Sequence, residues 1–143
     1  MISTRASAFI IKDNKLLFAK NKDSPYYLVG GGIERGETSK EALQREIFEE
    51  TGLSLEVDKL AIIQERFGII DNQKFHEIRF FYSVKNDAPI NIAEGTFTDQ
   101  GTDETLHWLP IDKLHDFNIV PKFLQSMKFD NMETIKHVVA REY

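Results

Sequence analysis

Residues 31–53 read GGIERGETSKEALQREIFEETGL and carry the clearest pattern in the chain. Within them, Thr38-Ser39-Lys40-Glu41 is a capping box, which predicts that a helix begins directly after Thr38. Gly52 suits the left-handed conformation in which helices end. Leu43 and Ile47 lie four residues apart, so they predict an apolar stripe that faces the core. The stretch therefore predicts a loop–helix–loop unit.

Three glutamates share one face of this helix. Glu46, Glu49 and Glu50 stand at positions i, i+3 and i+4. Pairs of like charges at these spacings cost roughly 0.2–0.5 kcal/mol each, and the helix dipole disfavours acids in the last turn. A solvated charge stripe is the alternative, but Leu43 and Ile47 flank Glu46 and Glu50, so the acidic face borders the core. A hard divalent cation would remove the conflict, because it prefers oxygen ligands and brings opposite charge.

The same residues resemble the Nudix box. That box is a glycine, five residues, a glutamate, seven residues, and then Arg-Glu-apolar-x-Glu-Glu-x-Gly-apolar. The specified positions are all met here, by Gly31, Glu37, Arg45, Glu46, Ile47, Glu49, Glu50, Gly52 and Leu53. At ordinary residue frequencies the chance of such a match in a chain of this length is below about one in ten million. The box therefore identifies a family, although it covers only a small part of the chain.

The resemblance implies both a fold and a reaction. The fold is α/β: a Nudix-type α/β/α sandwich with a mixed central sheet and the box as a loop–helix–loop catalytic motif. The reaction is hydrolysis within the diphosphate of a nucleoside diphosphate linked to another moiety. Glu46, Glu49 and Glu50 are then the ligands of Mg²⁺, with Mn²⁺ as an alternative ion, and the Gly30 carbonyl is a further candidate ligand. Glu46 and Glu50 are both candidates for the base that deprotonates water.

Arg45 and Glu37 complete the predicted catalytic set. Arg45 lies four residues before Glu49, so it can pair with that carboxylate and hold it in place. It could also reach Glu37 in the preceding loop. We favour this orienting role over contact with a substrate phosphate. Glu37 is predicted to organise the loop, the alternative being an ordinary exposed acid.

Some family members supply a further acid from a loop across the cleft. Asp103 and Glu104 are the candidates here, because they stand just before a predicted strand that carries Trp108. Glu94 and Asp99 are weaker candidates, and each of the four could instead be an ordinary surface acid. The phase of strand alternation is not set by the sequence, so the choice between Asp103 and Glu104 stays open.

Outside the box the chain reads mainly as β-structure. Strands are predicted at residues 6–11, 15–19, 26–29, within 55–70, at 75–84 and at 104–109, with a hairpin turn at Asp13-Asn14 and a bulge at Gly68. Residues 111–114 suit a short helical turn, and Pro121 suits the first turn of a second helix over residues 121–127. Thr134 to Arg141 fits either an edge strand or a helix end.

Composition narrows the class of protein. A chain of 143 residues has the size of one domain, so we expect a single Nudix domain over residues 1–143. The formal net charge of -5 argues against a nucleic-acid duplex or an anionic membrane as partner. There is no cysteine for thiol chemistry, no apolar run near the roughly 20 residues of a membrane span, and no leader pattern after Met1. A cytoplasmic location is expected, and a homodimer is left open.

Motifs of several substrate classes are absent. The coenzyme A signature and the tail motif of NADH pyrophosphatases are missing. So are the proline of many ADP-ribose pyrophosphatases and the tyrosine of diadenosine polyphosphate hydrolases. The remaining resemblance is to small mutator-type members, which predicts a nucleoside triphosphate or related small nucleotide as substrate. The alternatives are ADP-ribose, a nucleotide sugar, a non-nucleotide diphosphate, or a nucleotide-sensing domain without turnover, which the intact box disfavours.

Overall fold

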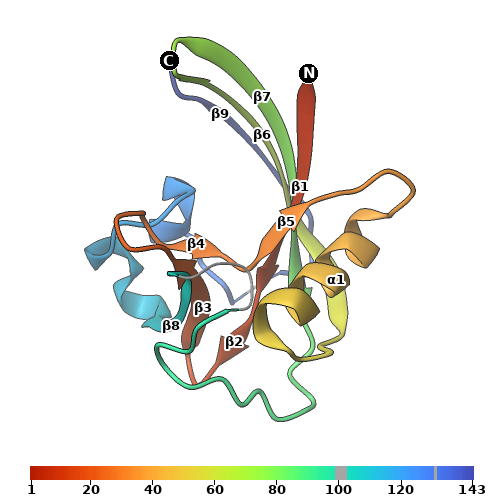
Figure 1. The fold of residues 1–143 in the computed structure, drawn as a ribbon, viewed down its shortest axis with the longest axis vertical. Helices are drawn as coiled ribbons and strands as arrows, with labels where there is room; N and C mark the ends of the chain where they lie inside the picture. The colour runs from red at the N-terminus through yellow and green to blue at the C-terminus, as the bar shows by residue number, and fades with distance from the viewer. Residues whose placement is uncertain (99–102, 131) are drawn as a thin grey trace.

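The computed structural model describes residues 1–98, 103–130 and 132–143, and most of them belong to two sheets (Figure 1). The larger sheet has the strand order β5 (Gly30–Gly32), β1 (Ile2–Phe9), β7 (Gln73–Val84), β6 (Val57–Ile70) and β9 (Lys136–Arg141). The pairs β1–β7 and β6–β9 are parallel, whereas β1–β5 and β6–β7 are antiparallel. The central sheet is therefore mixed, as predicted.

The smaller sheet is built around β3 (Lys15–Lys20). This strand pairs with β2 (Ile11–Lys12), β4 (Tyr27–Leu28) and β8 (Thr105–Pro110). The predicted turn between β2 and β3 is formed by Asp13 and Asn14, with φ of 52° and 59°. Asn and Asp tolerate this left-handed conformation because their short side chains hydrogen-bond locally.

Helices cover both faces of the larger sheet. On one face α1 (Ser39–Thr51) buries Leu43 and Ile47 in a cluster with residues of β1 and β3. On the other face two short 3-10 helices, η1 (Ile111–Asp116) and η2 (Lys122–Gln125), bury Leu114 and Leu124 against a second cluster. These layers give the expected α/β/α sandwich, which Figure 1 shows with α1 beside β1 and β5.

The second α-helix predicted over residues 121–127 is not formed, so that prediction is wrong. The segment contains only the four-residue η2, and no side chain caps its N-terminus. Helix nucleation is unfavourable and needs further turns to offset it. A single 3-10 turn that packs Leu124 into the core is therefore the stable outcome.

One detail of the larger sheet differs from the prediction, and one open choice is resolved. Gly68 is not bulged: it pairs in register with Phe75, and the register shifts of β6 lie between Val57 and Ile62. A side chain at Gly68 would overlap the Phe75 ring, since an added Cβ would lie 2.4 Å from it, so the glycine makes room for a cross-strand aromatic. The open choice for residues 134–141 resolves as the edge strand β9.

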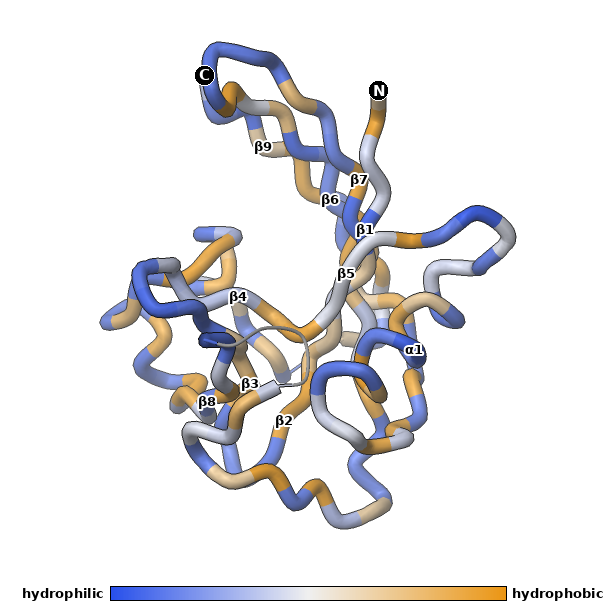
Figure 2. The backbone as a smooth tube through the Cα atoms, viewed as in Figure 1, coloured by the Kyte–Doolittle hydropathy of each residue, from blue (hydrophilic) through white to orange (hydrophobic). Residues whose placement is uncertain are grey.

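The hairpin of β6 and β7 extends beyond the rest of the molecule, and both chain termini lie at the same end (Figure 1). Its turn is hydrophilic, whereas the hydrophobic residues concentrate in the body where the two sheets and α1 meet (Figure 2). Among the described residues, no helix is long and apolar enough to cross a membrane.

Candidate active site

The capping residues fix α1 at both ends, as predicted. Thr38 Oγ1 accepts from the Glu41 amide at 3.1 Å, and the Glu41 carboxylate accepts from the Thr38 amide at 2.9 Å. At the other end Gly52 adopts φ 75°, and its amide donates to the Phe48 carbonyl at 2.8 Å. These local bonds determine where α1 begins and ends, and the spacing of the three glutamates within it puts them on one face.

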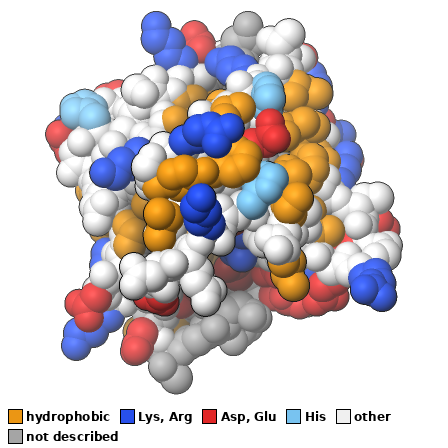
Figure 3. All heavy atoms as spheres, turned by 90° about the horizontal axis from the view of Figure 1, so that it is seen from above, with side chains coloured by type: hydrophobic (Ala, Val, Ile, Leu, Met, Phe, Trp, Pro, Cys, Tyr) orange, Lys and Arg blue, Asp and Glu red, His pale blue; other side chains and the backbone are white. Residues whose placement is uncertain are grey.

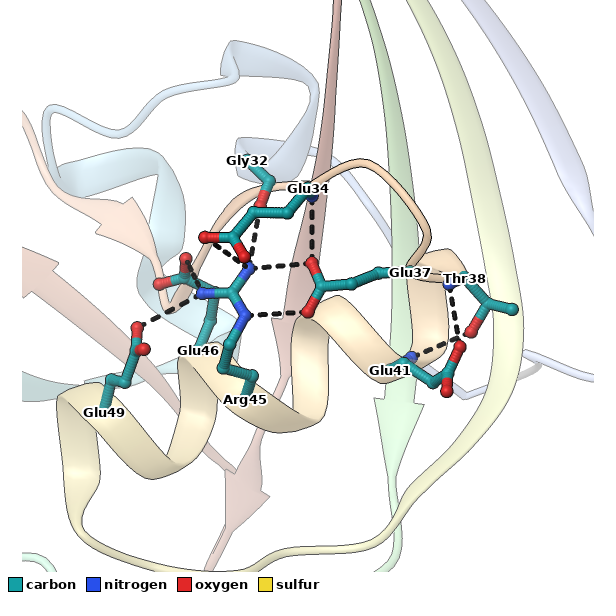
Figure 4. A network of polar contacts seen from close by, with 8 residues as sticks. All are labelled: Gly32, Glu34, Glu37, Thr38, Glu41, Arg45, Glu46 and Glu49. Carbon is teal, nitrogen blue, oxygen red and sulfur yellow. Dashed lines mark hydrogen bonds and ion pairs between the residues drawn. The ribbon is translucent and has the colours of Figure 1, made fainter.

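Arg45 links the loop to the acidic face of the helix (Figure 4). It donates to both oxygens of Glu37, at 2.8 and 3.0 Å, a bidentate geometry that restricts both side chains. Its Nη1 donates to Glu46 at 2.9 Å and to Glu49 at 3.3 Å, and its Nη2 donates to the Gly32 carbonyl at 3.2 Å. Both contacts predicted for Arg45 are thus present together.

The charged groups in this network shift one another's pKa values. The hydrogen bonds from Arg45 lower the pKa of Glu37 to about 2, helped by the backbone N–H of Glu34. The same Glu37 bonds raise the pKa of Arg45. Burial raises the pKa of Glu46, and the hydrogen bond from Arg45 partly offsets that rise.

Two glycines of β5 lie directly against the carboxylates. An added Cβ at Gly31 would lie 2.4–2.8 Å from the atoms of the Glu46 carboxylate, so only glycine leaves room for it. The amide of Gly30 donates to Glu50 at 3.0 Å, and an added Cβ there would lie 2.1 Å from the Ala6 carbonyl oxygen. The structure therefore brings Gly30 to Glu50, while a role for its carbonyl as metal ligand stays a prediction.

Glu50 faces a second buried acid, Glu104. Glu50 is only 7% exposed and Glu104 only 8%. Burial raises the pKa of Glu50 to about 8, and the charge of Glu104 adds to the rise. Glu104 is held by hydrogen bonds from the hydroxyl of Tyr27 and, at 2.7 Å, from that of Thr98. Burial and Glu104 raise the pKa of Tyr27 in turn.

The other candidate acids lie elsewhere. Asp103 is exposed, so the structure brings Glu104 and not Asp103 towards Glu50. Glu94 accepts from the Trp108 amide at 2.8 Å and pairs with the His107 ring at 2.5 Å, contacts that brace β8. Asp99 lies outside the described residues.

Tyr27 and Thr98 belong to the site but were not predicted from the sequence. Tyr27 lies three residues before Gly30, and its neighbour Tyr26 is also a tyrosine, so the pattern alone did not show which hydroxyl turns towards the acids. Thr98 stands six residues before Glu104 in an irregular segment with no periodicity to orient it. Both roles depend on contacts that only the folded chain makes.

The donor chemistry of the site fits a hard divalent cation. Glu46, Glu49 and Glu50 offer carboxylate oxygens, which Mg²⁺ prefers, and Gly31 leaves space beside one of them. Within the described residues no three acidic or histidine side chains already converge as a ligand set. Arg45 engages one oxygen each of Glu46 and Glu49, which leaves the second oxygen of each carboxylate for a cation.

Comparison with known proteins agrees with this geometry. A family model described as "NUDIX domain" matches residues 1–127. The chain belongs to the Nudix family. A "Putative 8-oxo-dGTP diphosphatase" of Bacillus subtilis (strain 168) is 31% identical over 130 residues, covering 87% of this chain and 78% of that protein. An "ADP-ribose pyrophosphatase" of Methanocaldococcus jannaschii is 51% identical over 55 residues, which are 36% of this chain and 32% of that protein.

Solved structures share the Nudix fold. The mutator MutT protein from Bacillus halodurans superimposes with a TM-score of 0.67 at 17% identity, covering 94% of this chain and 89% of that one. Family and relatives together make this chain a Nudix hydrolase that acts on phosphoric anhydride bonds in small nucleotide or diphosphate substrates. Nudix hydrolases generally need divalent metal ions.

Proposed function

We propose that this Nudix hydrolase is a Mg²⁺-dependent pyrophosphohydrolase, able to use Mn²⁺, that cleaves a diphosphate bond of a nucleoside triphosphate or related small nucleotide. The observation that carries the proposal is the buried pair of Glu50 and Glu104 beside the Arg45 network. Two buried acids facing each other without a cation between them are costly to keep ionised. The Bacillus subtilis relative, named for a nucleoside triphosphate, supports the substrate class.

Each residue has a role in this proposal. Glu46, Glu49 and Glu50 hold the cation, with the Gly30 carbonyl as a further ligand. A divalent ion bound there supplies charge neutralisation of the diphosphate and a more acidic water. Arg45 and Glu37 hold Glu46 and Glu49 in position.

In this proposal Glu46 and Glu50 are both candidates for the base that accepts the proton of the attacking water, because each belongs to the acidic face beside β5. Glu104 is the far-side acid, held by Tyr27 and Thr98, and Asp103 has no part in the chemistry.

ADP-ribose is the second candidate substrate. It is favoured by the relative from Methanocaldococcus jannaschii, which shares 51% identity over 55 residues. A nucleotide sugar or a non-nucleotide diphosphate would use the same residues.

We further propose that residues 1–143 form a single domain that works in the cytoplasm without a nucleic-acid duplex or a membrane as partner. The net charge of -5 supports the exclusion of these two partners, because a nucleic-acid duplex and an anionic membrane would both repel an acidic protein. Size-exclusion chromatography with light scattering distinguishes a monomer from a homodimer.

A hydrolysis screen tests the proposed reaction. The purified protein is incubated with Mg²⁺ or Mn²⁺ and with nucleoside triphosphates, oxidised nucleotides, ADP-ribose, nucleotide sugars and dinucleoside polyphosphates. Glu50→Gln should abolish turnover, whereas Asp103→Asn, a matched change at an exposed acid, should retain it. No turnover of any compound by the folded wild type would overturn the proposed reaction, and preferred cleavage of ADP-ribose would replace the substrate class.

A further inference from the structure

A strongly basic hollow lies on the larger sheet outside the acidic site. It has a volume of about 520 Å³, and its charged lining consists of Arg5, Arg66, Lys74, Glu77 and Arg79. Four cations against one carboxylate leave an excess of three positive charges, and Glu142, which pairs with Arg66 at 2.6 Å, reduces the excess to two. We call this feature the basic hollow. It stands out because the whole chain carries a net charge of -5.

The register of the strands explains how these side chains gather. Arg5 pairs with Arg79 between β1 and β7, and Glu77 pairs with Arg66 between β7 and β6. Strand residues two apart point to the same face, so Glu77 and Arg79 lie on one side of β7. In Figure 3, which views the end of the molecule where the termini lie, Lys and Arg side chains stand among hydrophobic ones.

Glu77 is the centre of the basic hollow and is only 5% exposed. Arg79 donates to it at 3.0 Å, and Arg5 and Arg66 approach it at 3.5 and 3.6 Å. A single carboxylate cannot neutralise three guanidinium groups. Instead, Glu77 orients the side chains of Arg5, Arg66 and Arg79, so that their N–H donors point into the basic hollow.

The hydrogen bonding of the basic hollow is incomplete. The Nε of Arg79 is buried and has no hydrogen-bond partner in the part of the chain that the structure describes. Burial lowers the pKa of this arginine, which is the effect of charge held away from water. A buried donor without an acceptor is costly, and the Oε2 of Glu77 beside it is buried and likewise has no hydrogen bond among the described residues. An anion that brings oxygen acceptors would offset the excess positive charge of the side chains that line the hollow.

Arg5 connects the basic hollow to the proposed catalytic site. It pairs in register with Gly32, next to the glycine that adjoins Glu46. Its charge lowers the pKa of both Glu46 and Glu50, opposing the larger effect of burial. The arginine at the edge of the basic hollow is therefore close enough to the glutamates for its charge to act on them.

We propose that the basic hollow binds a phosphate group of the substrate other than the two joined by the bond that is cleaved. Arginine is suited to this task because its planar fork matches phosphate oxygens. The inference rests on the proposed function and refines it. It favours a nucleoside triphosphate, which has a third phosphate, over ADP-ribose, which has two.

The first test measures phosphate binding without the metal site. Inorganic phosphate is titrated in EDTA at low ionic strength, with calorimetry and the arginine Nε–H signals in ¹⁵N-resolved NMR as readouts. Arg5→Gln removes a half-exposed cation, and Arg79→Lys keeps the charge but loses the fork. The matched control is Arg141→Gln, because Arg141 stacks on Phe67 and does not line the basic hollow.

The expected result is that phosphate binds the wild type and Arg141→Gln alike. Arg5→Gln and Arg79→Lys should weaken binding about tenfold, the loss of one charge-assisted hydrogen bond. Equal phosphate affinity in all four proteins, or no binding to the wild type, would overturn the proposal. Circular dichroism of each variant shows whether it is folded. If Arg79→Lys does not fold, Arg5→Gln alone still tests the proposal.

The second test asks whether this phosphate belongs to the substrate. The ratio of kcat/KM for a nucleoside triphosphate to that for ADP-ribose should fall about tenfold in Arg5→Gln and stay constant in Arg141→Gln. An unchanged ratio would show that the basic hollow does not bind the substrate. If the wild type cleaves no compound of the hydrolysis screen, the proposed function fails, while the titration in EDTA still measures phosphate binding independently.

Discussion

Replacing Gly31 by alanine should separate the position of Glu46 from the stability of the fold. An added Cβ at Gly31 would lie 2.4 Å from the Glu46 carboxylate carbon, whereas ordinary contacts begin at 3.4 Å. The carboxylate must therefore move by about 1 Å. Such a misplacement of a catalytic group costs about 10²-fold in rate, so we expect kcat/KM of Gly31→Ala to fall by about that factor.

The melting temperature should change little, because the atoms that must move are the end of a flexible side chain. Removing a glycine also restricts the unfolded chain, which stabilises by about 0.4–1 kcal/mol where the native conformation is compatible. The matched control is Gly32→Ala, since an added Cβ there meets nothing closer than the Thr4 carbonyl oxygen at 4.0 Å. Steady-state kinetics and thermal unfolding are measured on both variants. Equal rates in the two would refute the reasoning that Gly31 makes room for Glu46.

Three further outcomes are expected. Activity on the best substrate should vanish in EDTA and return with Mg²⁺, and full activity in chelator would contradict the metal mechanism. Glu104→Gln should lower kcat by about 10²–10⁴-fold with little change in KM, while Asp103→Asn keeps the wild-type rate; the opposite order would move the far-side role to Asp103. Because the pKa of Glu37 is lowered to about 2, below its ordinary 4.5, its contact with Arg45 stabilises fully above pH 4.5 and is lost as pH falls through about 2. The difference in melting temperature between wild type and Glu37→Gln should shrink over that range, and a difference independent of pH would contradict this reading.

The local features of the box were readable from the sequence because they depend on neighbours within one helical turn or one loop. The capping box, the glycine end of α1 and the shared face of Glu46, Glu49 and Glu50 all follow from spacing. The contacts of Arg45 to Glu49 and Glu37 could also be predicted from the sequence, because only four and eight residues separate these pairs. The hairpin at Asp13-Asn14 is local in the same sense.

Tertiary structure decided what joins distant segments. The burial of Glu104 near Glu50, with Asp103 left exposed, depends on Tyr27, which lies 77 residues away. No periodicity in an irregular segment can set that orientation. Residues 136–141 became a strand because β6 offered them an open edge, and residues 121–127 stayed a short turn because no cap supported a longer helix.

The basic hollow is the clearest product of the tertiary fold. Arg5, Arg66, Glu77 and Arg79 come from three strands, and in the sequence each reads as an ordinary charged residue of an alternating pattern. Their meeting depends on the parallel pairing of β1 with β7 and the antiparallel pairing of β7 with β6. Register between strands arises from packing over the whole sheet. The sequence by itself thus determined the reaction class and the acidic helix, whereas the burial of Glu104 near Glu50 and the basic hollow required distant strands to be brought together.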